Sequence, residues 1–215
     1  MLLQKLKIKL PGLSRHIRVK QSQSVHHRKN PAAAQQQLLY KQMDFHLFFY
    51  YDVGMKYAEW YTKITENLRT PEKIHCIQVL DKMLTGTMYV VYPAMLVYVY
   101  LYHKVLLVKE ISIPAVSFLL VSLLRKLYNR PRPYENGIIP LITKDTQGQS
   151  MPSRHIFSSA VISMGVLAVN IPLGGICWMI TILNAVVRVI GGVHYPSDVT
   201  AGILIGFLAG LCILF

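Results

Sequence analysis

Charged side chains are scarce in this chain of 215 residues. They make up 15% of it, against about 25% in an average soluble protein, while hydrophobic residues make up 53%. The mean hydropathy is accordingly positive, at +0.35. So little charge argues against a soluble globular protein and favours a membrane protein, and the length suits one catalytic domain.

Cysteine is rare too, since the sequence has only Cys76, Cys177 and Cys212. An odd number of thiols, scattered through apolar surroundings, offers neither a disulfide framework nor a zinc-ligand cluster. We therefore expect core thiols, no metal site and no cofactor.

Acidic residues are absent from the first 42 positions, although the chain as a whole has a formal net charge of +13. Nine Lys and Arg residues lie there: Lys5, Lys7, Lys9, Arg15, Arg18, Lys20, Arg28, Lys29 and Lys41. Beside a hydrophobic body, such a segment marks the cytoplasmic side or contacts anionic lipid headgroups rather than nucleic acid. We expect residues 1–42 to form a basic mobile tail. Whether they belong to the natural protein is open, because Met43 is an alternative start.

Residues 43–83 mix apolar side chains with charges. Between Phe45 and Leu68 the aromatic and aliphatic residues recur three or four positions apart, with acids and lysines between them. Charges at the centre of a bilayer are costly, so this pattern predicts an amphipathic interfacial helix rather than a span. A second such piece is expected over Pro71–Lys82, with its proline in the first turn.

Five apolar stretches follow, each near the length of about 20 residues that a transmembrane helix needs. They are Leu84–Tyr102, Leu106–Leu124, Ile156–Ile171, Ile176–Gly191 and Val199–Phe215. We predict an all-α fold, a multi-pass membrane helical bundle of five spans, with residues 84–215 as the catalytic transmembrane domain. A sixth span at Phe45–Ile64 stays open.

Smaller features refine this bundle. Lys109 and Glu110 are expected at the starting edge of the second span, and a turn is expected at Pro172–Gly175. Glycines recur every four residues in the last stretch, at Gly202 and Gly206 and again at Gly210. Such a strip lets another helix approach closely, and it favours packing inside the bundle over dimerisation.

Polar residues gather at three ends of these stretches. The first cluster runs from Arg125 to Pro133 and includes Lys126 and Arg132. By itself it is compatible with the positive charge that flanks many spans. However, Pro131 and Pro133 stiffen the chain and fix the direction of the neighbouring guanidiniums, which suit bidentate contact with phosphate.

The second cluster is Met151–His155, at the start of the third span. Ser153 could simply cap the helix. The same helix start exposes backbone N–H groups that favour an anion, to which Ser153 and Arg154 would add donors. His155 titrates near neutral pH and could give a proton to a leaving alkoxide.

The third cluster adds a nucleophile with an orienting partner. His194 and Asp198 are four residues apart, with Pro196 between them, so a helix should begin near Tyr195 or Pro196. Asp198 in its first turn could reach back to the His194 ring, fix its tautomer and leave the other nitrogen free to attack phosphorus.

Together the three clusters resemble the type 2 phosphatidic acid phosphatase superfamily, whose motifs are K-x6-R-P, P-S-G-H and S-R-x5-H-x3-D. Their counterparts here are Arg125 with Arg132-Pro133, then Pro152–His155, and then Val187-Arg188 with His194 and Asp198. The resemblance covers about residues 84–215. Arg125, followed by Lys126, replaces the motif lysine; Arg154 replaces its glycine and Val187 its first serine.

The resemblance implies a helical bundle and a two-step, metal-independent reaction. His194 would attack phosphorus and form a phosphohistidine, Asp198 would hold His194, and His155 would protonate the leaving oxygen. Phosphate would be bound by six further residues: Arg125, Lys126, Arg132, Ser153, Arg154 and Arg188. Small bacterial members act on undecaprenyl diphosphate or phosphatidylglycerophosphate, and the sequence does not choose between such phospholipid and polyprenyl phosphate substrates.

Two other functions compete with this one. A non-catalytic binder or transporter of lipid phosphates would bind anionic lipid without turnover. A relative that holds vanadate for halide oxidation would use the same residue cluster, although such enzymes are soluble and larger. The side of the cell membrane that the site faces and the oligomeric state stay open.

Overall fold

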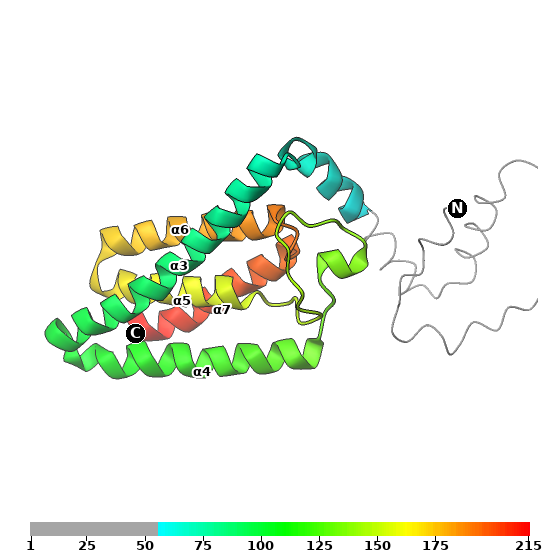
Figure 1. Cartoon of the computed structure of the whole chain (residues 1–215). Helices are drawn as coiled ribbons and strands as arrows, with labels where there is room; N and C mark the ends of the chain where they lie inside the picture. Colours follow the sequence, from blue (N-terminus) through cyan, green and yellow to red (C-terminus); the bar gives the residue numbers. More distant parts are fainter. Residues whose placement is uncertain (1–55) are drawn as a thin grey trace, which may run out of the picture. The chain divides into compact units, whose positions relative to one another are not determined.

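The computed structural model describes residues 56–215. The chain divides into two units, Met1–Tyr57 and Ala58–Phe215, and the second contains the helical bundle of Figure 1. The expected tail over residues 1–42 and the first part of the interfacial region, residues 43–55, lie outside the described residues.

Helices make up most of the described part of the chain, and that part contains no strand. A helix over residues 56–65 leads into η2 (Glu66–Leu68), followed by α3 (Pro71–Tyr102), α4 (Lys104–Tyr128), η3 (Pro133–Asn136), α5 (Arg154–Val169), α6 (Ile171–Ile190) and α7 (Pro196–Leu214). Four helices, α3, α4, α6 and α7, are long and apolar enough to cross a membrane, and α5 is a shorter apolar helix of 16 residues. The predicted all-α membrane bundle is confirmed.

Helix α5 forms the centre of the bundle and packs most extensively against α7 and α6. Its apolar residues belong to three core clusters: Ile156 to one with residues of α6 and α7, Phe157 to one with residues of α4 and α7, and Ile162 to one with residues of α3 and α6. A helix that is apolar all round belongs inside such a bundle, because its neighbours cover every face.

The glycine strip of α7 packs against α5, as predicted. A Cβ at Gly202 would lie 2.8 Å from the carbonyl oxygen of Ser153, and one at Gly206 would lie 2.7 Å from that of Phe157. Only glycine permits this approach of two backbones, so the strip sets the distance between α5 and α7.

The interfacial piece predicted over Pro71–Lys82 and the span predicted over Leu84–Tyr102 form one continuous helix, α3, of 32 residues. Asp81 explains the difference. Its side chain is buried and Oδ1 lies 3.2 Å from Nη2 of Arg188 on α6. The charge of Asp81, which is typical of an interfacial helix, is therefore paired with Arg188 inside the bundle.

The turn expected at Pro172–Gly175 was wrong, since α6 already begins at Ile171. Asn170 caps the helix by accepting a hydrogen bond from the Leu173 N–H at 3.0 Å, and proline is well tolerated in a first turn. Gly174 allows close packing, because a Cβ there would lie 2.5 Å from the Cα of Leu167.

Two smaller expectations also need correction. Cys177 is buried, but Cys76 and Cys212 are exposed on their helices, so only one of the thiols belongs to the core. Glu110 is not at the edge of its helix but fully buried in the second turn of α4, against α5.

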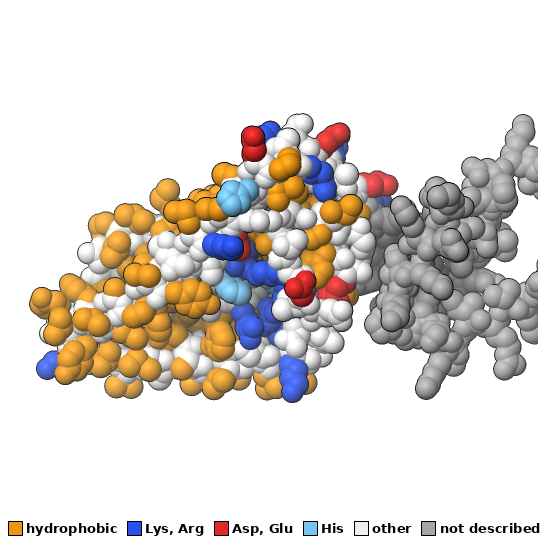
Figure 2. All heavy atoms as spheres, viewed as in Figure 1, with side chains coloured by type: hydrophobic (Ala, Val, Ile, Leu, Met, Phe, Trp, Pro, Cys, Tyr) orange, Lys and Arg blue, Asp and Glu red, His pale blue; other side chains and the backbone are white. Residues whose placement is uncertain are grey.

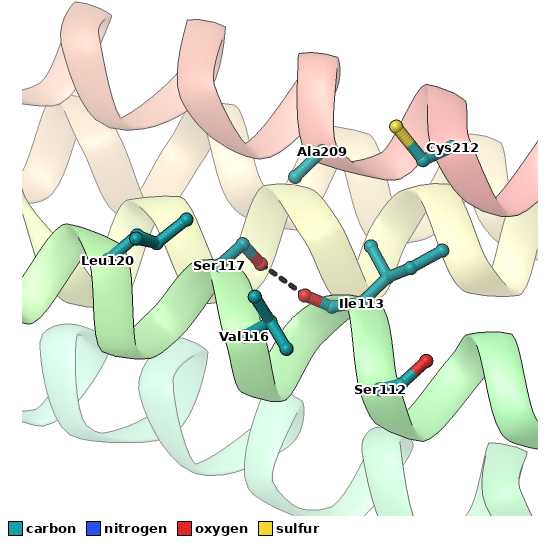
Figure 3. Close-up of a pocket in the computed structure, with 7 residues that line it drawn as sticks. All are labelled: Ser112, Ile113, Val116, Ser117, Leu120, Ala209 and Cys212. Atoms are coloured by element: carbon teal, nitrogen blue, oxygen red, sulfur yellow. Dashed lines mark hydrogen bonds between the residues drawn. The ribbon is translucent and has the colours of Figure 1, made fainter.

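An apolar groove of about 310 Å³ lies between α4 and α7 (Figure 3). It is lined by Ser112, Ile113, Val116, Ser117, Leu120, Ala209 and Cys212. The groove has no charged side chain, so chemistry on a charged group must be sought elsewhere.

Candidate active site

The three polar clusters of the sequence meet at one end of the bundle, where Figure 1 shows the loop over residues 129–153 beside the start of α5 and the α6–α7 junction. Backbone hydrogen bonds join them. The Ser153 N–H donates to the Asp198 carbonyl at 2.9 Å, and the Ser150 N–H donates to the Arg130 carbonyl at the same distance. Figure 2 shows Lys, Arg and His side chains gathered at the edge of the apolar surface.

The α6–α7 junction positions His194. Gly192 has φ +73°, a left-handed conformation that favours glycine. Pro196, four residues later, begins α7 as predicted. Asp198 lies in the first turn, where Oδ2 accepts a hydrogen bond from the Tyr195 N–H at 3.0 Å. The carboxylate thereby caps the helix that carries it.

His194 and Asp198 face each other in the protein interior. Nδ1 of His194 lies 3.5 Å from Oδ2 of Asp198, and their side chains are 2% and 0% exposed. This distance exceeds that of a full hydrogen bond, and Nδ1 has no hydrogen-bond partner in the described part of the chain. Because the carboxylate faces Nδ1, Nε2 is the ring nitrogen left for another group.

Burial lowers the pKa of His194 to about 4. Asp198 opposes this shift because it favours the protonated ring, whereas Arg132 and Arg188 add to it. At neutral pH the ring is therefore uncharged, and one nitrogen has a free electron pair.

Asp198 has two further partners that the sequence analysis missed. Arg130 donates from Nη1 to Oδ1 at 2.8 Å, and its guanidinium lies 4.3 Å from the centre of the Tyr195 ring. The Ser150 hydroxyl donates to Oδ2. Arg130 could have been suspected from its place in the first cluster, whereas nothing in the sequence singles out Ser150.

The second cluster forms the N-terminus of α5. Ser153 is the capping residue, yet its buried hydroxyl has no hydrogen-bond partner among residues 56–215. His155 follows in the first turn, half-buried and within electrostatic range of His194 and Arg188. Arg154 is exposed, with its guanidinium 5.8 Å from the Phe118 ring.

The cations of the first cluster differ in their placement. Arg125 is buried and donates to the carbonyl of Pro152, and Arg132 is buried and donates from Nε to the carbonyl of Gly148 at 3.1 Å. Lys126 instead lies exposed on α4. The structure thus brings Arg125 to the site and leaves Lys126 at the surface.

Arg188 is held from three sides. Its Nε donates to Asn184 Oδ1 at 3.1 Å, while Nη2 donates to Thr85 Oγ1 at 2.9 Å and lies 3.2 Å from Asp81 Oδ1. These contacts to α3 were not foreseen. They fix the guanidinium so that only Nη1 stays without a partner in the described residues.

Several buried donors at this end therefore have no acceptor in the described protein. They include the Ser153 hydroxyl, Nη1 of Arg188 and Nε of Arg125. Unpaired buried donors are costly, and an anion with several oxygens would satisfy them together.

No group of three or more His, Cys, Asp or Glu side chains that could hold a metal occurs within residues 56–215. The donors gathered at the site include guanidinium and hydroxyl groups, which can donate hydrogen bonds to the oxygens of an anion.

A family model described as the PAP2 superfamily matches residues 107–214, which include all three clusters. No curated protein sequence matches the chain.

Two solved structures are similar to this one. Aquifex aeolicus LpxE has a TM-score of 0.59 and 24% sequence identity, over 73% of this chain and 93% of that one. The first transmembrane PAP2 type phosphatidylglycerolphosphate phosphatase from Bacillus subtilis has a TM-score of 0.43 and 18% identity, over 74% of this chain and 93% of that one. The likeness to the first concerns the fold.

Proposed function

The chain belongs to the PAP2 superfamily, and on that premise we propose that it hydrolyses the phosphate monoester or diphosphate of a membrane lipid through a phosphohistidine on His194. The observation that carries the proposal is the buried His194–Asp198 pair beside guanidinium and hydroxyl donors that lack acceptors. A nucleophile beside donors suited to an anion, at the end of a membrane bundle, fits a lipid phosphate. We place the protein in the cell membrane.

In the first step, Nε2 of His194 attacks phosphorus. Asp198 faces Nδ1 and favours the tautomer that carries its proton there, so that Nε2 has the free electron pair. Arg130 and Ser150 hold Asp198 in this position. The N–P bond forms as the bond from phosphorus to the leaving oxygen breaks. Burial and the neighbouring cations lower the pKa of His155 to about 3 in the protein alone, and the negative charge of the bound phosphate favours its protonated form, which gives the leaving oxygen a proton.

In the second step, water attacks the phosphohistidine and His155 takes up its proton, which restores the enzyme and releases phosphate. Arg125, Arg132, Ser153 and Arg188 bind the phosphoryl oxygens throughout. Donors held in fixed positions stabilise charge that develops on those oxygens without reorganising, and they supply the electrostatic role that metals have in other phosphatases. Arg154 contacts the outer oxygens, and Lys126 is the weakest member of the predicted set because it is exposed.

The test is phosphate release by the purified full chain in detergent from a panel of lipid phosphates and diphosphates, with and without a chelator. His194→Ala should lower turnover by at least about 10³-fold. His75→Ala, which removes an exposed histidine on α3, should leave turnover unchanged.

The other outcomes contradict parts of the proposal. Full activity of His194→Ala would exclude this nucleophile, and loss of activity in chelator would exclude a metal-free reaction. Tight binding of every lipid phosphate with no release from any of them would support the non-catalytic binder or transporter.

A further inference from the structure

Lys144 lies in the loop between η3 and α5, outside the three motif clusters. Hydrogen bonds anchor the loop on both sides of Lys144. The Leu141 and Ile142 N–H groups donate to the Gly191 carbonyl at 3.1 and 3.0 Å, and the Gly148 carbonyl accepts from Arg132 Nε. Lys144 is therefore held beside the site by a fixed backbone.

The surroundings of Lys144 are cationic. Its half-buried ammonium lies within electrostatic range of Arg188, Arg132 and Arg125, and the acid in range is Asp81. Burial, followed by these guanidiniums, lowers the pKa of Lys144 to about 8, so the ammonium is still largely protonated at neutral pH. It makes no hydrogen bond and no ion pair within the described chain.

The two buried carboxylates of this end are already paired with arginines. Asp198 lies 2.8 Å from Nη1 of Arg130, and Asp81 lies 3.2 Å from Nη2 of Arg188. A structural lysine would be expected to share such a carboxylate, because burial of an unpaired charge is costly. Lys144 does not, which leaves its charge for a ligand.

Arg125, Arg132, Arg154 and Lys144 thus lie at this end without an ion pair to a carboxylate of the described residues. A phosphate monoester has a charge of about −1.5 to −2 at neutral pH, which two guanidiniums already match. A diphosphate carries further negative charge on its inner phosphate. The additional ammonium fits that group, and Lys is a flexible point charge suited to a phosphate whose position varies with the lipid.

We propose that Lys144 binds the inner phosphate of a lipid diphosphate and selects such substrates over lipid monophosphates. This rests on the proposed function, because it takes phosphoryl transfer to His194 as given. The outer phosphorus is transferred to Nε2, and the bond between that phosphorus and the bridging oxygen breaks. The bridging oxygen leaves with the lipid monophosphate, whose growing charge Lys144 neutralises, and water then releases inorganic phosphate from His194.

The experiment compares kcat/KM for a polyprenyl diphosphate and for the monophosphate of the same polyprenol, using the full chain in detergent. Lys144→Gln should lower the value for the diphosphate about 10- to 100-fold, as expected for a charged hydrogen bond, and change the value for the monophosphate by less than about threefold. Lys144→Arg should restore part of the loss. Lys82→Gln, which removes an exposed charge on α3, is the matched control.

The outcomes separate this inference from the proposed function. Equal losses on both substrates would show that Lys144 serves the transferred phosphoryl group and overturn the selection. No loss on either, or a wild-type preference for the monophosphate, would overturn it as well. Failure of the wild-type protein to hydrolyse any lipid phosphate would instead remove the proposed function itself.

Discussion

Two buried carboxyl groups show how differently the two regions of this bundle treat charge. Asp198, at the polar end, is surrounded by the Tyr195 N–H, the Ser150 hydroxyl, the Arg130 guanidinium and the His194 ring. Glu110, on α4 near the C-terminal end of α5, is also fully buried, yet neither of its carboxyl oxygens has a hydrogen-bond partner in the described part of the chain.

The difference comes from the available donors. Asp198 lies in the first turn of a helix, where backbone N–H groups are unpaired, and loops bring further donors to it. Glu110 lies within a helix whose neighbours have already used their backbone N–H groups. Burial alone therefore does not position a carboxyl group for catalysis. A helix end with several loops does, because it supplies the donors that hold the carboxylate.

The largest effect should come from replacing each carboxyl group by its amide. Asp198→Asn would keep the shape but favour the wrong tautomer of His194, so we expect kcat to fall by about 10³- to 10⁴-fold, as in other carboxylate–histidine pairs. Glu110→Gln should leave kcat within about threefold, since Glu110 contacts α5 at Gly165 rather than the site. Steady-state phosphate release measures both.

Equal losses in the two variants would contradict this distinction between the regions. Both proteins should first be shown to have the elution volume and helical content of the wild type, because a folding defect would also abolish turnover.

The positions of the helices could be predicted from the sequence because apolar stretches of the right length leave few alternatives. The α6–α7 junction could be predicted as well, since Pro196 and the spacing of His194 and Asp198 are local features. The false turn at Pro172 shows the limit of such evidence. Proline and glycine suit a turn and a helix start equally well, and the Asn170 cap decides between them.

The partners of the site could not be predicted, since they come from distant parts of the chain. Asp81 on α3 pairs with Arg188 on α6, and the loop before α5 brings Ser150 to Asp198. Lys144 belongs to none of the three motifs, and only the anchored loop shows that it lies near the site. Local spacing identifies residues that share a turn, whereas the fold determines which turns meet.

The pH dependence of kcat/KM should show a smaller effect that also distinguishes the polar end from the region around Glu110. The pKa of His194 is lowered to about 4, so the nucleophile stays neutral well below its usual range and kcat/KM should fall about tenfold per pH unit only below about pH 4. Between the ordinary value of 6.5 and about 4 the unfolded chain binds a proton that the folded chain refuses, so stability should decrease as the pH falls.

Glu110→Gln should show the same acid limb in a pH profile of phosphate release from pH 3 to 8, because His194 determines it. A limb that moves toward pH 6.5 in the wild type, or one that disappears in Glu110→Gln, would contradict this assignment.

The smallest effect concerns stability around Glu110. Gly165→Ala would place a Cβ in close contact with Oε2 of Glu110 and 3.1 Å from its carboxyl carbon, and we expect this crowding to lower stability by about 1–3 kcal/mol. Gly86→Ala is the matched control, since a Cβ there meets nothing within 4 Å, and it should be neutral or stabilising by about 1 kcal/mol. Thermal unfolding in detergent measures the shifts, at about 2–4 °C per kcal/mol.

A double-mutant cycle then isolates the contact between α4 and α5. In a Glu110→Ala background the carboxyl group is gone, so Gly165→Ala should lose most of its cost if the crowding is its cause. A cost that stays the same would place the strain in the α5 backbone, and it would remove the reason for a glycine opposite Glu110. Turnover should be the same in every variant of this cycle, because it depends on donors that contact Asp198 and on none that contact Glu110.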